Sequence, residues 1–241
     1  TMENRLLEVE GASKQYRLGM IGGGTLHGDF TSWFARIRGK EDPNTKIGAE
    51  HYGPNETFWA LRDVSFNVDR GDAVAINGCR NTRLEECSIH GMGHVAARID
   101  RDSRSCGLSR CELYDLGAGA VELGGGDRVN IVRGDNYVEN CRIHNFNRIE
   151  MQYRGGGVMA GLGNRISGCE FYQSATMAIL MLGNDQTVEY CNVHHVCMDI
   201  EDNGALYHGR NPAQRGSVIR GNYFHDIEVP FNVRALYHDD G

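Results

Sequence analysis

Two short segments near the end of the chain hold most of the side chains that could carry out chemistry. They are residues 199–210 and 234–241, and both contain the tetrapeptide Ala-Leu-Tyr-His, thirty residues apart. Tyrosine rings offer flat apolar faces with a polar tip, and arginine pairs with acidic groups through two parallel hydrogen bonds. Two carboxylates can act as acid and base, or as acid and nucleophile, on a glycosidic bond. This combination of residue types predicts a carbohydrate site.

The candidate residues follow from these segments and from the polar pairs before them. The catalytic candidates are carboxylates: Asp202, Asp239 and Asp240. The substrate-binding candidates are aromatic or charged: Tyr207, His208, Arg210, Tyr237, His238, Asp185, Tyr153 and Arg154. Aligning the two tetrapeptides would stack Tyr207 on Tyr237 and His208 on His238, and would place Arg210 beside Asp240. The alternative interpretation is that several are turn residues, since Gly-Asn-Asp is ordinary turn chemistry.

A sequence repeat predicts the fold that positions these residues. The pattern aliphatic-x-x-Cys/Asn-x-apolar-His/Tyr occurs six times, with its Cys/Asn position at Cys87, Cys111, Cys141, Cys169, Cys191 and Asn222. The copies are 22–31 residues apart, and each is followed by a second short apolar run. Helical repeats need longer amphipathic stretches, and propeller blades need four strands in about 40 residues. Short strands at this period predict an all-β, right-handed parallel β-helix of about six rungs.

The repeat also explains the cysteines. Five of the eight share one inward position, where a small, soft side chain suits a tight core, and Asn222 could pair with the backbone of the bend. The close cysteine pairs typical of zinc sites are absent, so we predict no metal and no cofactor. The histidines of the His/Tyr position are expected to form a structural or solvent-facing stripe.

Several motifs of residues 78–241 occur in the order found in one protein family. They include Gly124-Gly125-Gly126-Asp127-Arg128, Gly161-Leu162-Gly163-Asn164-Arg165, Asp202-x-Gly204-Ala205-Leu206-Tyr207 and Leu236-Tyr237-x-Asp239-Asp240-Gly241. This stretch resembles secreted right-handed β-helix proteins of bacterial polysaccharide degradation, most closely glycoside-hydrolase-like members that act on fucose- or xylose-containing glycans. The resemblance implies hydrolysis, with Asp202 and either Asp239 or Asp240 as the acid/base pair. Where those proteins carry a histidine after Asn184-Asp185, this chain has Gln186.

Residues 1–77 do not show the repeat. The opening of an ABC-transporter ATPase is similar to four stretches, residues 7–10, 13–16, 59–66 and 71–76, and the insert through residues 35–43 is similar to the polysaccharide-exporting branch of that family. The phosphate-binding loop that should follow Ile76 is absent. We therefore predict an incomplete ABC-ATPase-like segment at 1–77, small and β-rich, joined to the β-helix at 78–241. This junction, and an end at Gly241, are typical of a fragment or chimera, in which activity could be lost.

Composition limits the classes of partner that the chain is expected to bind. A net charge of −7 argues against nucleic-acid binding, which favours a basic surface. The sequence contains no run of about 18 apolar residues, so it predicts no membrane-spanning helix. The first residues lack the features of a signal peptide, so the chain as written would stay in the cytoplasm, although the β-helix proteins that it resembles are secreted.

Four classes of function stay open at this point. The first is a glycoside hydrolase-like protein acting on a bacterial, plant or algal polysaccharide or oligosaccharide through paired aspartates, and the sequence leans toward it. The second is a polysaccharide lyase or epimerase on the same scaffold. The third is a non-catalytic glycan-binding or structural module. The fourth is an ABC-transporter-related protein of polysaccharide export, which only residues 1–77 support.

Overall fold

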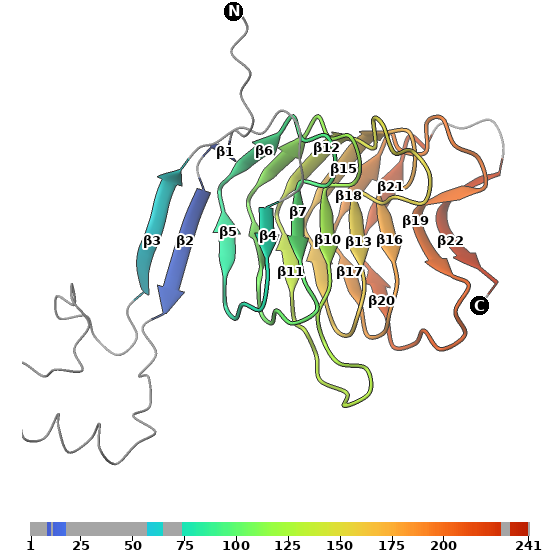
Figure 1. Cartoon of the computed structure of the whole chain (residues 1–241). Coiled ribbons are helices and arrows are strands. Elements are labelled where there is room, and N and C mark those ends of the chain that lie inside the picture. The colour runs from blue at the N-terminus through green and yellow to red at the C-terminus, as the bar shows by residue number, and fades with distance from the viewer. Residues whose placement is uncertain (1–8, 11, 18–56, 65–73, 228–231, 241) are drawn as a thin grey trace, which may run out of the picture. The chain divides into compact units, whose positions relative to one another are not determined.

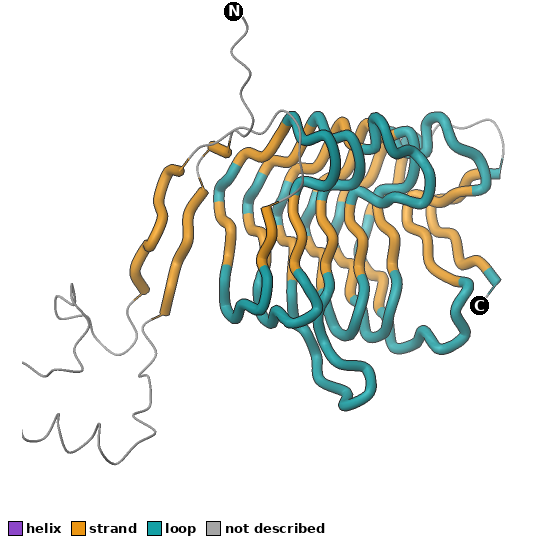
Figure 2. Tube along the Cα trace, in the orientation of Figure 1, coloured by secondary structure: helices purple, strands orange, loops and turns teal. Residues whose placement is uncertain are grey.

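The computed structural model describes residues 9–10, 12–17, 57–64, 74–227 and 232–240. These residues form strands, turns and loops, with no helix among them (Figures 1 and 2). The chain divides into two compact units, one of Gln15–Ala60 and one made of Thr1–Lys14 and Leu61–Gly241. The second unit contains the stack of coils. Of the segment predicted to be ATPase-like, residues 9–10, 12–17, 57–64 and 74–77 are described and the rest lies outside the described residues.

Three sheets of parallel strands form the walls of the stack. Sheet 1 holds β6 (Ser88–His90), β9 (Glu112–Tyr114), β12 (Arg142–Phe146), β15 (Glu170–Ser174), β18 (Asn192–His194) and β21 (Tyr223–His225). Sheet 2 holds β4 (Val74–Ile76), β7 (Ala97–Ile99), β10 (Val121–Leu123), β13 (Gly157–Met159), β16 (Ile179–Met181), β19 (Asn203–Gly209) and β22 (Val233–Asp239). Sheet 3 contains β5 (Arg83–Glu85), β8 (Gly107–Ser109), β11 (Tyr137–Glu139), β14 (Arg165–Ser167), β17 (Thr187–Glu189) and β20 (Val218–Arg220).

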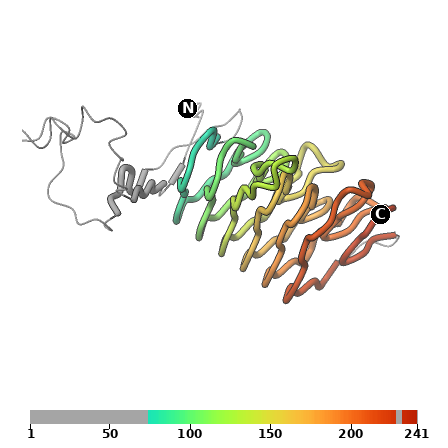
Figure 3. The backbone as a smooth tube through the Cα atoms, turned by 90° about the horizontal axis from the view of Figure 1, so that it is seen from below, coloured from blue at the N-terminus to red at the C-terminus, as the bar shows by residue number. Residues whose placement is uncertain are grey.

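The chain visits the sheets in a fixed order and returns one strand further along each time. Figure 3 shows the resulting coils one behind another from residue 74 onward. Each strand pairs with the next coil residue for residue, as Leu84 does with Leu108 and Val138 with Ile166. The predicted parallel β-helix is confirmed, with about five complete turns between the first and last copies of the repeat. Strand β4, which pairs with β7, is already part of the stack.

Three strands precede the stack in the sequence. Strand β1 (Val9–Glu10) pairs antiparallel with β6, and Lys14 of β2 (Ala12–Arg17) lies opposite Leu84 in β5, again antiparallel. Strand β3 covers Thr57–Val64. No helix in the described part of the chain is long and apolar enough to cross a membrane.

The cysteine position of the repeat faces the interior, as predicted. Cys87, Cys111, Cys141, Cys169 and Cys191 are each at most 2% exposed and lie one above another where sheet 3 bends into sheet 1. All eight cysteines of the chain are free thiols. At the sixth position, Asn222 accepts a hydrogen bond from the backbone of Cys191 at 2.9 Å and donates one to the carbonyl of Val188 at 3.0 Å. The amide thus continues the column by satisfying backbone groups.

A second internal column lies where sheet 2 bends into sheet 3, and the sequence analysis did not predict it. Asn136, Asn164 and Gln186 are fully buried and stand on successive coils. The side-chain oxygen of each accepts a hydrogen bond from the backbone N–H of the coil before it, at 2.9–3.1 Å. Gln186 therefore lies inside the stack and has a packing role there.

The His/Tyr position forms one continuous column of rings on the outer face of sheet 1. The rings of His90, Tyr114, His144, Tyr172, His194 and His225 are stacked with centroids 4.6–5.2 Å apart. This separation matches the spacing of neighbouring strands. The predicted structural stripe of histidines is confirmed, and two of its histidines are 3.4 Å from the neighbouring carboxylates Glu112 and Glu170.

Candidate functional site

The outer face of sheet 2 carries the predicted tyrosines. One row of residues in this sheet points away from the core, because side chains alternate along each strand. In register, this outward row reads Arg98, Glu122, Val158, Leu180, Tyr207 and Tyr237. From β7 to β22 the row crosses five strand spacings, about 24 Å at ~4.8 Å per strand. It runs from charged through apolar to aromatic side chains.

Tyr207 is the most buried polar member of this row. Its side chain is 5% exposed and packs with Met177 and Leu180 in a small cluster separate from the main core. Its hydroxyl donates a short hydrogen bond to Oδ2 of Asp239, and Nε of Arg210 donates to the same oxygen at 2.6 Å. Oδ1 of Asp239 accepts no hydrogen bond from any described residue. Oδ2 is thus fixed by two donors, in a residue that is only 8% exposed.

These contacts set the charge state of the three groups. The hydroxyl of Tyr207, and then the guanidinium of Arg210, hold the pKa of Asp239 below its ordinary value. Burial, and then the same hydrogen bond, raise the pKa of Tyr207. Hydrogen bonding to a charged form favours that form. Asp239 is therefore a carboxylate, Tyr207 a neutral phenol and Arg210 a cation over the whole neutral range.

The second tyrosine is held by the second aspartate. The hydroxyl of Tyr237 donates to Oδ1 of Asp202 at 2.9 Å, and the amide of Asn232 donates to the same oxygen at 3.1 Å. The rings of Tyr207 and Tyr237 meet edge to face, with centroids 5.4 Å apart. The bond to Asp202 raises the pKa of Tyr237. Asp202 and Asp239 thus lie at either end of one tyrosine pair, each bonded to a different hydroxyl.

The histidines of the repeated tetrapeptide face the other way. His208 pairs in register with His238, as predicted, and their rings stack 5.1 Å apart. In the pairing of β16 with β19, His208 lies opposite Met181, a core residue, whereas Tyr207 lies opposite Leu180 on the outer face. Burial, and then His238, lower the pKa of His208. These two histidines do not share the face of the tyrosines.

The ion pair of Arg210 also differs from the prediction. It is made with Asp239 and not with Asp240. The physical reason is strand alternation, because Tyr237 and Asp239 are two residues apart and share a face. Asp240, one residue further, is exposed and has a positive φ of 42°.

The remaining candidates separate into two groups. Tyr153 is 61% exposed and acts electrostatically on Tyr207 and Arg210, so it belongs to the same flank. Arg154 is next to it and bonds Glu150 at 2.9 Å and Glu122 at 3.4 Å. Asp185 lies elsewhere, in a groove where sheet 2 turns into sheet 3.

Sequence reasoning missed the charged end of the outward row. Glu122 accepts from Arg98 at 2.6 Å and from Arg154, and Glu150 accepts from Arg154 and pairs with His94 at 3.1 Å. The signal available was the single polar residue in the middle of each short apolar run, at Arg98 and Glu122. This network extends the polar surface of sheet 2 toward the first coils.

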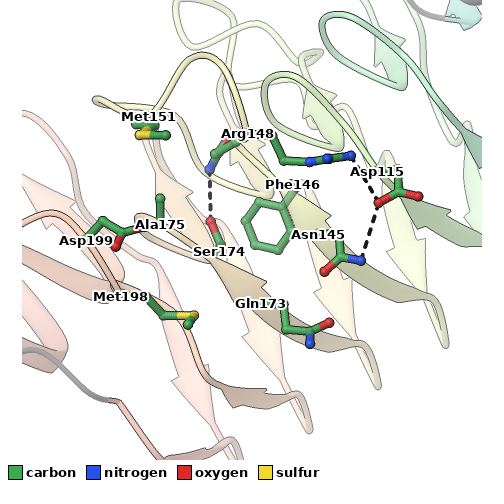
Figure 4. A pocket seen from close by; sticks show the side chains of 11 residues that line it. Asp115, Asn145, Phe146, Arg148, Met151, Gln173, Ser174, Ala175, Met198 and Asp199 are labelled. Atoms are coloured by element: carbon green, nitrogen blue, oxygen red, sulfur yellow. Dashed lines mark hydrogen bonds and ion pairs between the residues drawn. The ribbon is translucent and has the colours of Figure 1, made fainter.

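A pocket of about 510 Å³ opens at the turns that lead from sheet 1 to sheet 2. Figure 4 shows Arg148 and Asn145 pointing toward Asp115, with Met151 and Met198 at the rim. Arg148 and Asn145 reach Oδ1 of Asp115 at 3.3 and 3.4 Å. The loop that carries Arg148 and Met151 continues directly into Tyr153, and the turn that carries Met198 continues to Asp202. Amide, carboxylate and thioether groups together suit a polar ligand with an apolar face.

The described residues contain no group of three or more His, Cys, Asp or Glu side chains that could hold a metal ion. Comparison with curated proteins and with solved structures gave no match. The model of one family, described as the right-handed beta helix region, matches residues 72–235. That match covers well over half of the chain and coincides with the coils described above. The chain therefore belongs to the right-handed β-helix family.

Proposed function

We propose that this protein is a carbohydrate-active β-helix, glycoside hydrolase-like, that acts on a polysaccharide lying on the outer face of sheet 2. One observation carries the proposal: the carboxylate of Asp239 is held by Tyr207 and Arg210, beside a tyrosine pair that ends on Asp202. The family to which the chain belongs supports it in a coarser way, since such coils are common in carbohydrate-active enzymes.

The charge state of Asp239 sets its role in this proposal. Asp239 stays ionised, so in this proposal it serves as the nucleophile, or as the base that activates water. A hydrolase also needs a group that gives a proton to the leaving oxygen. We assign that role to Asp202, which is exposed and bonded through Oδ1 to Tyr237 and Asn232.

The surrounding side chains would hold the sugar rings. Aromatic rings pack against apolar faces of ligands and direct their hydroxyls outward. Tyr153 is exposed, and Tyr237 is half-buried with the guanidinium of Arg234 over its ring, 4.6 Å from the centroid. The charged network of Glu122 and Arg154 lies further along the same face and offers hydrogen bonds to sugar hydroxyls.

The test is release of reducing sugars from a broad panel of plant, algal and bacterial polysaccharides by the purified full chain. We expect release from at least one polysaccharide, and its loss in Asp202→Asn. Asp102→Asn is the matched control, because Asp102 is an exposed turn aspartate without a role in this site. A folded sample that releases nothing from the whole panel contradicts the proposal. Products that absorb in the ultraviolet would identify a lyase on the same face.

A further inference from the structure

The turns that lead from sheet 2 to sheet 3 carry a column of arginines. Arg80, Arg104 and Arg133 come from three successive coils: the backbone of Arg80 pairs with that of Arg104, and Ser105 donates to the carbonyl of Gly134. Successive coils are separated by ~4.8 Å. Like charges this close repel one another. They stand together in a chain whose net charge is −7.

A groove of about 450 Å³ is lined by this column. Arg133 is neutralised by Asp135 at 2.9 Å. Arg80 and Arg104 make no side-chain hydrogen bond or ion pair with any described residue, so their guanidinium donors are available to a ligand. Asn81 and Ser105 occupy equivalent positions on the same two coils, both with a φ of 53°, and add neutral donors. The groove therefore presents donors and positive charge.

The loop between β10 and β11 forms one wall of this groove and projects from the lower edge of the stack in Figure 1. Asp127 fixes its shape: the carboxylate accepts from the backbone of Val129 at 2.9 Å and from the side chain of Asn130 at 2.6 Å. Its charge also interacts with that of Arg104. Ile131, 78% exposed, lines this groove and a second one on the other side of the loop.

The second groove, of about 380 Å³, repeats the same chemistry. Arg128 and Arg215 line it, with Asp185 as the acidic member. Arg210, the partner of Asp239, begins the turn that contains Arg215. Arginines therefore stand at this edge on the first three coils and again at Arg210, beside the proposed catalytic carboxylate, about five strand spacings or ~24 Å away. The two coils between them carry Asn164 and Asp185 at the same edge.

We propose that this arginine-lined edge binds the anionic groups of an acidic polysaccharide, whose chain runs along the helix axis toward Asp239. The groups are carboxylates or sulfate esters, since both present the paired oxygens that guanidinium donors match. The inference rests on the proposed function for taking the polymer to be a polysaccharide. It adds the substrate class: an acidic glycan in preference to a neutral one.

The experiment measures binding of the full chain to polygalacturonate, dextran sulfate and neutral dextran by affinity electrophoresis. We expect retardation by one or both acidic polymers, weakening as salt is raised, and none by dextran. The double variant Arg80→Gln/Arg104→Gln should raise the dissociation constant about tenfold or more, because two charge-assisted contacts are lost. The two acidic polymers distinguish carboxylate from sulfate.

The control variant is Arg110→Gln/Arg142→Gln, which removes the same charge from residues outside this edge that already have carboxylate partners. It should bind as the wild type does. Equal binding to dextran, equal loss in both double variants, or no loss in Arg80→Gln/Arg104→Gln overturns the inference. If that variant fails to fold, absence of salt-sensitive binding of wild type to either acidic polymer overturns it as well.

Failure here and failure of the proposed function are separable. Hydrolysis of neutral polysaccharides only, lost in Asp202→Asn, would leave the proposed function standing and remove the inference. Salt-sensitive binding to an acidic polymer without any product release would sustain the inference and remove hydrolysis.

Discussion

Tyr207 and Asp239 are bonded to each other across two neighbouring coils, through the phenolic hydroxyl and one carboxylate oxygen. The contact exists because β19 and β22 lie in register, with Tyr207 opposite Tyr237 and Gly209 opposite Asp239. Alternation along β22 then returns Asp239 to the face of the tyrosines. The position of the proposed nucleophile is therefore set by strand register, and changes in that register should be visible in activity.

Gly209 offers a test of this dependence on register. Its φ is 144°, and a Cβ at this position would clash with the carbonyl oxygen of Asp239. Gly209→Ala should separate the ends of β19 and β22, breaking the bond to Tyr207 and abolishing product release. Gly78→Ala is the control, because Gly78 also has a positive φ but its Cβ would meet nothing within 4 Å. It should lower stability by only ~1–2 kcal/mol and keep activity. Equal activity of the two variants in the reducing-sugar assay would argue against the role of this register.

The low pKa of Asp239 predicts the acid limit of activity. Because the folded-state pKa lies below the ordinary value of about 3.9, the ionised form persists as pH falls to that value and is lost only below it. Removing the guanidinium in Arg210→Gln should raise the pKa of Asp239 and move the acid limb of the kcat/KM profile to higher pH. The stabilisation linked to this group is likewise present above about pH 3.9 and lost as pH falls through the folded-state pKa. An acid limb that stays in place would exclude Asp239 as the group that must be ionised.

The buried amide column should be a large contributor to stability. Asn164→Ala removes the acceptor of the Asn136 backbone N–H, and it leaves the carbonyl of Ala160 with only the 3.3 Å bond from Gln186. An unsatisfied buried group costs ~1–3 kcal/mol, so we expect a loss of that size in the free energy of unfolding. Urea unfolding of this variant should be compared with that of Asn77→Ala, whose side chain is exposed. A loss no greater than that of the control would mean that the column is not needed.

The ring column on sheet 1 predicts a smaller effect. Tyr172 stacks on His144 and His194, with centroids 4.7 and 5.2 Å away. Stacked pairs contribute ~0.5–1.5 kcal/mol each beyond buried area, so Tyr172→Ala should lower the melting temperature clearly. Tyr190→Ala serves for comparison, since Tyr190 is 64% exposed and has no ring partner in the described residues. Similar melting temperatures for both variants would show that the stacking is incidental.

The repeat carries most of the information that predicted the fold. Identical residue types at Leu84 and Leu108, or at Cys111 and Cys141, can stack only if coils are added in register, so the period alone defines the walls and the core. The same logic placed Tyr207 on Tyr237. What it could not resolve was direction: the tetrapeptide alignment treated Tyr207 and His208 alike, although alternation sends them to opposite faces.

Other parts of the site could not be predicted from a period. The bond between Tyr237 and Asp202 depends on how the turn before β19 closes, and that turn matches no other copy of the repeat. Arg80 and Arg104 share one position of the repeat, seven residues before Cys87 and Cys111, so the period could have aligned them. Arg133 lies eight residues before Cys141, and only the backbone pairing of its turn brings it to the same edge.

The most direct test of the central claim is the steady-state kinetics of Asp239→Asn on whichever polysaccharide the wild type cleaves. The substitution keeps the size of the side chain and can still bond to Tyr207, so the coil and the binding face should persist. We predict a kcat lowered by about a thousandfold or more with KM changed little, because the group acts on the reacting centre. A variant with wild-type kcat would contradict the assignment of the reaction to this carboxylate and to this face of the helix.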